Sequence, residues 1–156
     1  MKRLLFLVTA LSLVLLMSCK KDSSPTKKDL LTAKSWKLSA YTIDPQIAIT
    51  DPNGNITGYT NDMYALLPDC SKDNTRKFNS DGSFVADEGV VKCDATAAQT
   101  TTGTWVFNSD QSGITLTGNT SVIYTIVELT STTLKIQTVA PIITINYTET
   151  LTFTNN

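Results

Sequence analysis

Cysteine offers the widest choice of chemistry in this sequence, and histidine is missing altogether. The 156 residues include three cysteines, at Cys19, Cys70 and Cys93, and no histidine. This composition excludes a Ser-His-Asp or Cys-His catalytic arrangement and an imidazole ligand for zinc or haem. No nucleophile, base and orienting group can be assembled together. We therefore expect a protein that is not an enzyme and that needs neither a metal nor a cofactor.

Cys19 stands at the end of an apolar segment that has the form of a signal peptide. Lys2 and Arg3 precede an apolar run that ends in Leu16-Met17-Ser18-Cys19. This ending resembles the bacterial lipobox, in which the cysteine thiol receives a diacylglyceryl group, the chain is cut before it, and the new amine is acylated. We expect residues 1–18 to be the signal peptide and residues 19–29 to be the lipidated cysteine with a flexible tether. An ordinary secretory peptide with a chance cysteine is the alternative.

Lipidation of Cys19 implies attachment to the cell envelope, and we expect the outer membrane, at its periplasmic or its surface face. Each buried methylene contributes about 0.8 kcal/mol, so several acyl chains anchor a protein firmly. Export also bears on Cys70 and Cys93, because disulfides persist in oxidising compartments. We expect these two to form a disulfide rather than a metal pair. Closing a loop of about 24 residues contributes roughly 3 kcal/mol on the chain-entropy account.

The charge balance narrows the choice of partners. Loss of Lys2 and Arg3 from the 13 basic residues leaves 11 against 14 acidic ones, a net charge of −3. This balance argues against nucleic acid or a polybasic membrane contact as the partner. The remaining length suits one domain with one core.

The Asp51-Pro52-Asn53-Gly54-Asn55 segment has the alternating oxygens of a calcium loop, but turn chemistry explains it better.

The elements that must position these residues are mainly strands, because valine, isoleucine, tyrosine and threonine dominate after residue 100. The clearest pattern lies in residues 143–154, where Ile143, Ile145, Tyr147, Leu151 and Phe153 share one face and polar residues the other. Eight strands are predicted, over residues 35–43, 75–78, 83–87, 102–108, 113–117, 121–129, 132–140 and 143–154. A helical turn over 29–33 precedes them. Residues 44–73 are irregular, with a short helix around 62–67.

Eight strands joined by short turns predict an all-β fold. An open antiparallel sheet of this size would leave two exposed edges, and closing it into an up-and-down barrel removes them. We therefore expect an eight-stranded antiparallel barrel over residues 30–156, with a two-sheet sandwich as the alternative.

Several segments of the chain resemble the lipocalin-like lipoproteins of Bacteroidetes. They are residues 30–38 with Trp36, 69–73, 77–84, 87–89, 92–94, 102–105, 125–129 and 147–153. The resemblance implies a lipocalin-like, calycin-type barrel whose disulfide spans a hairpin. It implies no reaction and no specific ligand. Lys34-Ser35-Trp36 keeps the tryptophan of the Gly-x-Trp motif of true lipocalins and lacks its glycine.

Alternation along the strands predicts which side chains face the interior. In the first strand Trp36, Leu38 and Ala40 share a face. The whole inward set is Trp36, Leu38, Phe78, Phe84, Trp105, Phe107, Ile114, Leu116, Tyr147, Leu151 and Phe153. An eight-stranded barrel is just wide enough to be filled by side chains or to hold one small ligand, and both outcomes stay open. If a cup exists, we expect Trp36, Phe78, Trp105 and Tyr147 to line it.

Two charged residues interrupt these apolar faces. Arg76 shares the parity of Phe78, and Glu149 lies between Tyr147 and Leu151. A charged side chain that faces a core destabilises the fold unless it is paired with an opposite charge or remains in contact with water. Arg76 and Glu149 are therefore predicted to form an interior ion pair or a polar anchor for a ligand headgroup. The alternative is that a bulge or the rim places one or both in water.

The sequence as a whole predicts a membrane-anchored binding protein that takes up a small apolar or amphipathic molecule. The alternative is an interaction module with a filled barrel, whose segment from Asp44 to Asp73 engages another envelope protein or a glycan. An open interior volume favours the first function. A solid aromatic core with an exposed apolar patch on that segment favours the second.

Overall fold

The computed structural model describes residues 24–142 and 144–155, so the predicted signal peptide and the lipidation site Cys19 lie outside the described residues. The helices are α1 (Lys27–Thr32), α2 (Met63–Leu66) and α3 (Asp69–Lys72). The strands are β1 (Ser35–Thr50), β2 (Ile56–Asp62), β3 (Thr75–Phe78), β4 (Ser83–Asp87), β5 (Thr100–Phe107), β6 (Gly113–Thr117), β7 (Ser121–Leu129), β8 (Thr133–Ile142) and β9 (Ile145–Asn155). None of the helices in these ranges is long and apolar enough to cross a membrane.

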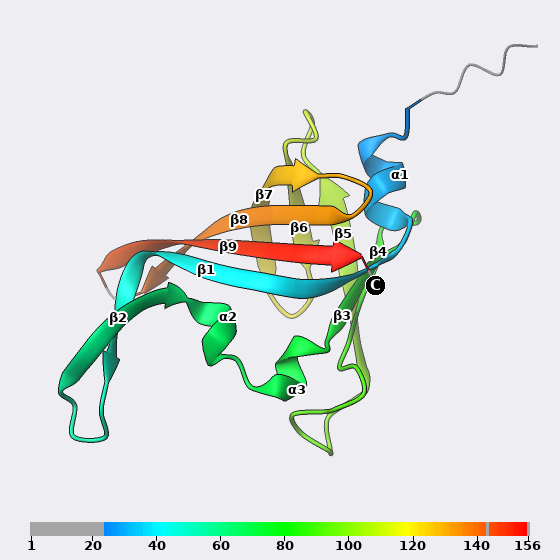
Figure 1. Ribbon diagram of the computed structural model, residues 1–156. Helices are drawn as coiled ribbons and strands as arrows, with labels where there is room; N and C mark the ends of the chain where they lie inside the picture. The colour runs from blue at the N-terminus through cyan, green and yellow to red at the C-terminus, as the bar shows by residue number, and fades with distance from the viewer. Residues whose placement is uncertain (1–23, 143, 156) are drawn as a thin grey trace, which may run out of the picture.

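Eight of the strands form a closed antiparallel barrel (Figure 1). β3 to β9 follow one another as neighbours, and β1 closes the circle by pairing with β3 on one side and β9 on the other. The closing register places Leu38 opposite Phe153 and Ile43 opposite Glu149. Because the first and last strands are paired, the predicted barrel is confirmed and the sandwich is wrong.

A bulge in β1 changes which side chains face the barrel interior. Leu38 pairs with Phe153, but Ala40 pairs with Thr152, so one extra residue is inserted at Ser39. The Ser39 hydroxyl donates a hydrogen bond to the Thr152 carbonyl oxygen across the bulge. Such an insertion reverses the parity of the residues that follow. The prediction that Ala40 shares the face of Trp36 is therefore wrong, and Tyr41 and Ile43 turn inward instead.

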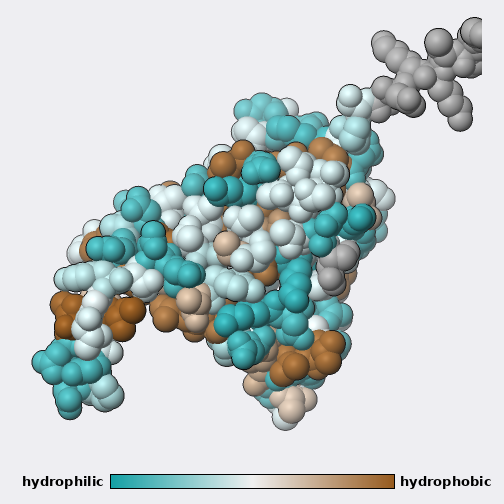
Figure 2. Space-filling model, viewed as in Figure 1, coloured by the Kyte–Doolittle hydropathy of each residue, from teal (hydrophilic) through white to brown (hydrophobic). Residues whose placement is uncertain are grey.

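β1 continues beyond the barrel and forms a two-stranded ribbon with β2. Its pairing with β9 ends at Asp44, and its pairing with β2 continues to Thr50. Figure 2 shows the ribbon projecting from the body of the molecule as a separate lobe. The sequence predicted an irregular segment here, so β2 is a correction. The Asp51 carboxylate accepts hydrogen bonds from the Asn53 and Asn55 amides, as the turn interpretation of this segment requires.

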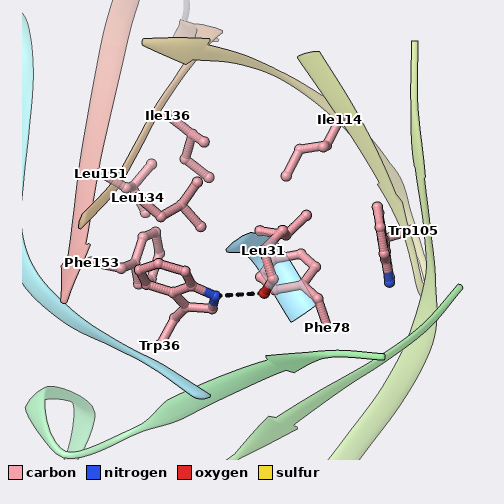
Figure 3. Packing of buried hydrophobic residues seen from close by; sticks show 9 residues of the cluster. All are labelled: Leu31, Trp36, Phe78, Trp105, Ile114, Leu134, Ile136, Leu151 and Phe153. Atoms are coloured by element: carbon pink, nitrogen blue, oxygen red, sulfur yellow. Dashed lines mark hydrogen bonds between the residues drawn. The ribbon is translucent and has the colours of Figure 1, made fainter. Parts of the chain in front are cut away.

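The short helix α1 covers one end of the barrel. It begins at Lys27 with Thr26 as its N-cap, and Thr26 and Asp29 form a reciprocal capping box. The helix therefore starts inside residues 19–29, which were expected to be tether. Leu31 of α1 is fully buried, and Trp36 Nε1 donates a hydrogen bond to the Leu31 carbonyl oxygen at 2.8 Å (Figure 3). We call this end, with the β3–β4, β5–β6 and β7–β8 turns, the closed end.

The closed half of the barrel is packed with aromatic side chains. Phe78 lies 5.2 Å from Phe84 and 5.8 Å from Trp105, and Trp105 lies 5.2 Å from Phe107, between ring centroids. The edge-to-face arrangement of the last two pairs is the favoured one for aromatic rings. The predicted inward residues join the core cluster, or pack against it, with the exception of Tyr147. The sequence missed Leu31, Leu134 and Ile136, which complete the core.

The predicted inward face of β9 is correct only in its second half. Leu151 and Phe153 are buried, and Tyr147 and Glu149 are half-buried. Ile145 is 47 % exposed, because it lies beside the β8–β9 turn and beyond the last residue of β9 that pairs with β1. The residue predicted to share its face, Ile143, is outside the described ranges. The interior of the barrel therefore changes from apolar to polar along β9.

Candidate functional site

Two cavities open at the end of the barrel opposite α1, which we call the open end. The first, of about 270 Å³, lies between the barrel wall and the segment that carries α2 and α3. It is lined by Leu38, Tyr41, Leu67, Ser71, Asn74, Arg76, Leu151 and Phe153. The second, of about 420 Å³, lies beside the β6–β7 turn and is lined chiefly by Phe84, Leu116, Val122, Tyr124 and residues 117–120. The interior of the barrel is therefore filled by the aromatic core toward the closed end, and these two cavities lie toward the open end.

A layer of polar side chains separates the aromatic core from the open end. Tyr41 comes from β1, Arg76 from β3, Tyr124 from β7 and Glu149 from β9, so four strands contribute to it. The Tyr41 hydroxyl donates a hydrogen bond to Glu149 Oε1 at 2.9 Å. Tyr41 and Arg76 line the first cavity and Tyr124 lines the second. The polar layer therefore borders both cavities.

Arg76 makes few contacts that compensate for its charge. Within residues 24–142 and 144–155, its guanidinium forms no hydrogen bond, and the one ion pair found joins Lys72 to Asp69. The guanidinium carbon lies 5.1 Å from the centre of the Phe153 ring, a cation–π contact. Such contacts contribute about 0.5 to 2 kcal/mol. An unpaired charge removed from water costs several kcal/mol, so this contact alone does not compensate for the burial of Arg76.

The predicted interior ion pair between Arg76 and Glu149 is not formed. Both side chains face the interior, as their strand parity predicted. The Glu149 carboxylate is instead held by Tyr41, which the bulge at Ser39 turns inward. The other polar side chains that line the first cavity with Arg76 are the neutral ones of Tyr41, Ser71 and Asn74.

Burial sets the protonation behaviour of this layer. Loss of solvent raises the pKa of Tyr41 to about 12, and its hydrogen bond to Glu149 and the charge of Glu149 add to the effect. Burial also raises the pKa of Tyr124, although the nearby Arg76 charge opposes that shift. Burial lowers the pKa of Arg76, but a guanidinium stays protonated in proteins. At neutral pH the layer therefore holds one cation and two protonated phenols.

A disulfide holds the outer wall of the first cavity in place. Cys70 of α3 is bonded to Cys93 in the β4–β5 loop, which confirms the predicted disulfide. Ser71 lies next to Cys70 in α3 and faces the cavity, and its hydroxyl is 3.4 Å from Cys93 Sγ. Because α3 has only four residues, it depends on this bond and on its flanking contacts for its position.

Asp73 fixes the loop on the other side of the disulfide. Its Oδ2 accepts hydrogen bonds from the Val90 and Val91 amides at 2.7 and 3.0 Å. These bonds lower the pKa of Asp73, with the Val91 amide as the largest cause. Gly89 precedes them with φ of +73°, and a Cβ there would lie 2.6 Å from Asp73 Oδ2, so this position requires glycine. The loop and α3 thus form one structural unit beside the first cavity.

The structure separates the six residues predicted to bind ligand into two groups. Trp36, Phe78 and Trp105 are buried at the closed end, where Trp36 Nε1 donates to Leu31 and Trp105 Nε1 donates to the Asn79 carbonyl oxygen. Trp105 also lines a hollow of about 320 Å³ with Lys28 and the β3–β4 turn, far from the open end. Tyr147 is half-buried and lines none of the cavities described above. Arg76 lines the first cavity, and Glu149 is one hydrogen bond away from it.

Sequence reasoning missed several residues that line the first cavity. Tyr41 was absent from the predicted inward set, because nothing in the sequence reveals the bulge at Ser39. Leu67 and Ser71 belong to residues 44–73, which were predicted as irregular, and Asn74 follows that segment directly. The signal that could have identified Ser71 is its position beside Cys70, since a disulfide brings its neighbours against the barrel.

A family model described as a lipocalin-like domain matches residues 32–136, from the end of α1 to the middle of β8. The matched range includes Tyr41, Arg76, Tyr124 and both disulfide cysteines, and it stops before Glu149. No curated protein matches the chain.

Proposed function

Because the chain belongs to the lipocalin-like domain family, we propose that it is a binding protein without catalytic activity that takes up a small amphipathic molecule at the open end of its barrel. The single observation that carries this proposal is the first cavity, in which apolar walls and a polar layer meet. Leu38, Leu67 and Leu151 offer an apolar surface. Arg76 and Tyr41 offer polar groups at one position within it. Small-molecule sites in proteins commonly combine these two kinds of wall.

The size of the two cavities suits a small ligand. The first cavity, of about 270 Å³, lies just below the usual range of ligand pockets, about 300 to 1,000 Å³, and the second, of about 420 Å³, lies in its lower part. The aromatic packing of Phe78, Phe84 and Trp105 limits the depth that a ligand can reach. A molecule bound here therefore occupies the open half of the barrel and not its full length.

Retention of a small molecule tests this function directly. Protein purified from its own host is analysed by native mass spectrometry, and we expect a bound molecule that is released on denaturation. The variant Ser71→Trp fills the first cavity from α3 and should abolish retention. Leu66→Trp is the matched control, because Leu66 lies on the neighbouring helix and is 54 % exposed. Retention that survives Ser71→Trp would place the ligand elsewhere.

We also propose that the protein is a lipoprotein of the bacterial cell envelope, anchored through Cys19 in the outer membrane. Support comes from the sequence Leu16-Met17-Ser18-Cys19 after an apolar run, which resembles a lipobox. The intact mass of the protein from its host should correspond to a chain that begins at Cys19 and carries acyl chains. Cys19→Ser should abolish both the acylation and the membrane attachment. An unmodified chain cut at another residue would contradict the anchor.

A second candidate function is favoured by the ribbon of β1 and β2. Ile56 and Tyr59 are more than half exposed there, and Leu66 is equally exposed on the adjoining α2. A group of exposed apolar side chains on a projecting element is typical of a surface that contacts another protein. A photoreactive amino acid at position 59 should then capture one envelope protein reproducibly, whereas the same group at the exposed Val139 of β8 should not.

A further inference from the structure

We propose that the ligand of the first cavity carries one anionic oxygen group, a carboxylate or a similar oxyanion, and that this group binds the Arg76 guanidinium. This inference rests on the proposed function and deepens it, because it names the chemical class of the ligand. It depends on three observations: the unpaired guanidinium, the neutral polar groups around it, and the apolar walls beside them.

The first observation is that Arg76 has donors without acceptors. Its guanidinium lies in the wall of the first cavity and touches the face of Phe153, and in the described part of the chain it forms neither a hydrogen bond nor an ion pair. A guanidinium carries five N–H donors in a planar fork that matches the two oxygens of a carboxylate. An oxyanion in the cavity would therefore both pair the charge and accept hydrogen bonds that no described residue accepts.

The second observation is that the one carboxylate of the polar layer is already held elsewhere. Glu149 accepts a hydrogen bond from the Tyr41 hydroxyl, which keeps it on the β1–β9 side of the barrel. Of the residues that line the first cavity, Arg76 alone is charged. Tyr41, Ser71 and Asn74 are the neutral polar groups beside it, and Tyr124 faces it from β7. The cavity itself is therefore positive.

The third observation limits the number of charges and the length of the ligand. A second negative charge would meet no second cation in the cavity wall and would face Glu149. A volume of about 270 Å³ equals roughly nine water molecules at ~30 Å³ each. A head group with an apolar tail of about eight carbons fills this space against Leu38, Leu67 and Leu151. The ligand class is thus a short monoanionic amphiphile.

Three probes with the same tail and different head groups test the inference. Octanoate, octanol and octylamine are titrated into the mature full-length chain at neutral pH, and binding is measured by calorimetry. Amide chemical shifts of Leu151 and Phe153 report whether a probe enters the first cavity. We expect octanoate to bind about ten- to a hundredfold more tightly than octanol, as a charge-assisted hydrogen bond provides, and octylamine to bind most weakly.

Variants of the polar layer identify the side chain that causes the preference for octanoate over octanol. Arg76→Met keeps the length of the side chain and should remove the preference for octanoate while leaving the affinity for octanol unchanged or higher. Arg76→Lys should keep part of the preference, because it retains the charge without the planar fork. Glu149→Gln is the matched control on the other charge of the layer. It should strengthen octanoate binding, because it removes a repelling carboxylate.

The outcomes separate this inference from the proposed function. Equal affinity for octanoate and octanol in the unaltered protein overturns the anionic ligand and leaves a general binding function intact. Preference for octylamine assigns the anchor to Glu149 and also overturns it. If none of the three probes binds and host-purified protein retains no molecule, the proposed function itself fails. The probe series on the unaltered chain decides the matter even where Arg76→Met does not fold.

Discussion

The indole nitrogen of Trp36 donates a hydrogen bond to the carbonyl oxygen of Leu31 at 2.8 Å, and this bond joins the first strand of the barrel to the helix that closes it. Both residues are buried, so the bond is protected from water (Figure 3). The Leu31 side chain fills the end of the barrel between Trp36 and Phe78. One residue of α1 thus completes the core and also provides the acceptor that a buried indole N–H requires.

Truncation of Leu31 should therefore destabilise the whole barrel. Leu31→Ala leaves a cavity beneath Trp36 and Phe78 and should lower the free energy of unfolding by about 2 to 5 kcal/mol. The matched control is Leu66→Ala, since Leu66 is 54 % exposed and its truncation should change stability by less than about 0.5 kcal/mol. Urea unfolding followed by tryptophan fluorescence measures both. Equal effects of the two variants would show that α1 does not belong to the core.

Loss of the disulfide should affect both stability and the first cavity. Cys70 and Cys93 are separated by 23 residues, and opening that loop should lower the free energy of unfolding by about 3 kcal/mol. The paired variant Cys70→Ser with Cys93→Ser is compared with the reduced unaltered protein in denaturant titrations. Because α3 carries Ser71, we also expect weaker binding of octanoate in both. Unchanged binding after reduction would mean that α3 keeps its position without the bond.

Stability should fall at alkaline pH because of Tyr41. Its pKa is raised from 10.0 to about 12, so the folded protein retains a proton that the unfolded chain loses. The stabilisation is fully present below pH 10 and is lost as the pH rises from 10 to 12. Tyr41→Phe should reduce this loss, and Tyr124, whose pKa is also raised, should account for part of the remainder.

Thermal melts between pH 8 and 12 measure the alkaline effect, together with the ultraviolet titration of the phenols. Tyr59→Phe is the control, because Tyr59 is 59 % exposed on the ribbon and should leave the alkaline loss as it is. A melting temperature that is constant up to pH 12 would contradict the burial of Tyr41 and its hydrogen bond to Glu149.

Stability should also fall in acid, in part because of Asp73. The Val90 and Val91 amides lower its pKa below the ordinary value of 3.8, so the folded protein holds its carboxylate ionised where the unfolded chain takes up a proton. The stabilisation is present above pH 3.8 and is lost as the pH falls through the lower, folded-state value. Asp73→Asn should flatten the fall in melting temperature below pH 4. Asp44→Asn, at an exposed position, is the control and should leave the acid limb unchanged.

The barrel could be predicted from the sequence because its strands carry a strong and simple pattern. From Tyr147 to Phe153 every second residue is threonine, and the inward face of this part of β9 follows directly from that alternation. An open sheet of these strands would leave two exposed edges, and closing it into a barrel removes them. The ribbon of β2 could not be predicted in this way. Residues Ile56 to Asp62 contain glycine and asparagine, are exposed on both faces, and owe their pairing to β1 rather than to burial.

Part of the candidate site could also be predicted from the alternation of side chains along the strands. Strand parity placed Arg76 and Glu149 in the interior, and both lie there. Their failure to pair depends on Tyr41, which reaches Glu149 because one extra residue at Ser39 reverses the parity of β1. A bulge of one residue leaves no mark in the composition of a strand. The chemistry of the open end thus depends on a backbone detail that only the three-dimensional pairing reveals.

The position of α1 determines how an anchored barrel faces its surroundings. The chain enters the domain through Thr26 at the closed end, where α1 lies (Figure 1). Arg76 and the two cavities belong to the open end. The seven residues from Lys20 to Thr26 reach at most about 25 Å. A lipid on Cys19 would hold that end next to the bilayer and orient the entrance toward the aqueous compartment. The ligand would then reach the cavities from the aqueous compartment. The lipid would attach the protein to the membrane and would take no part in ligand binding.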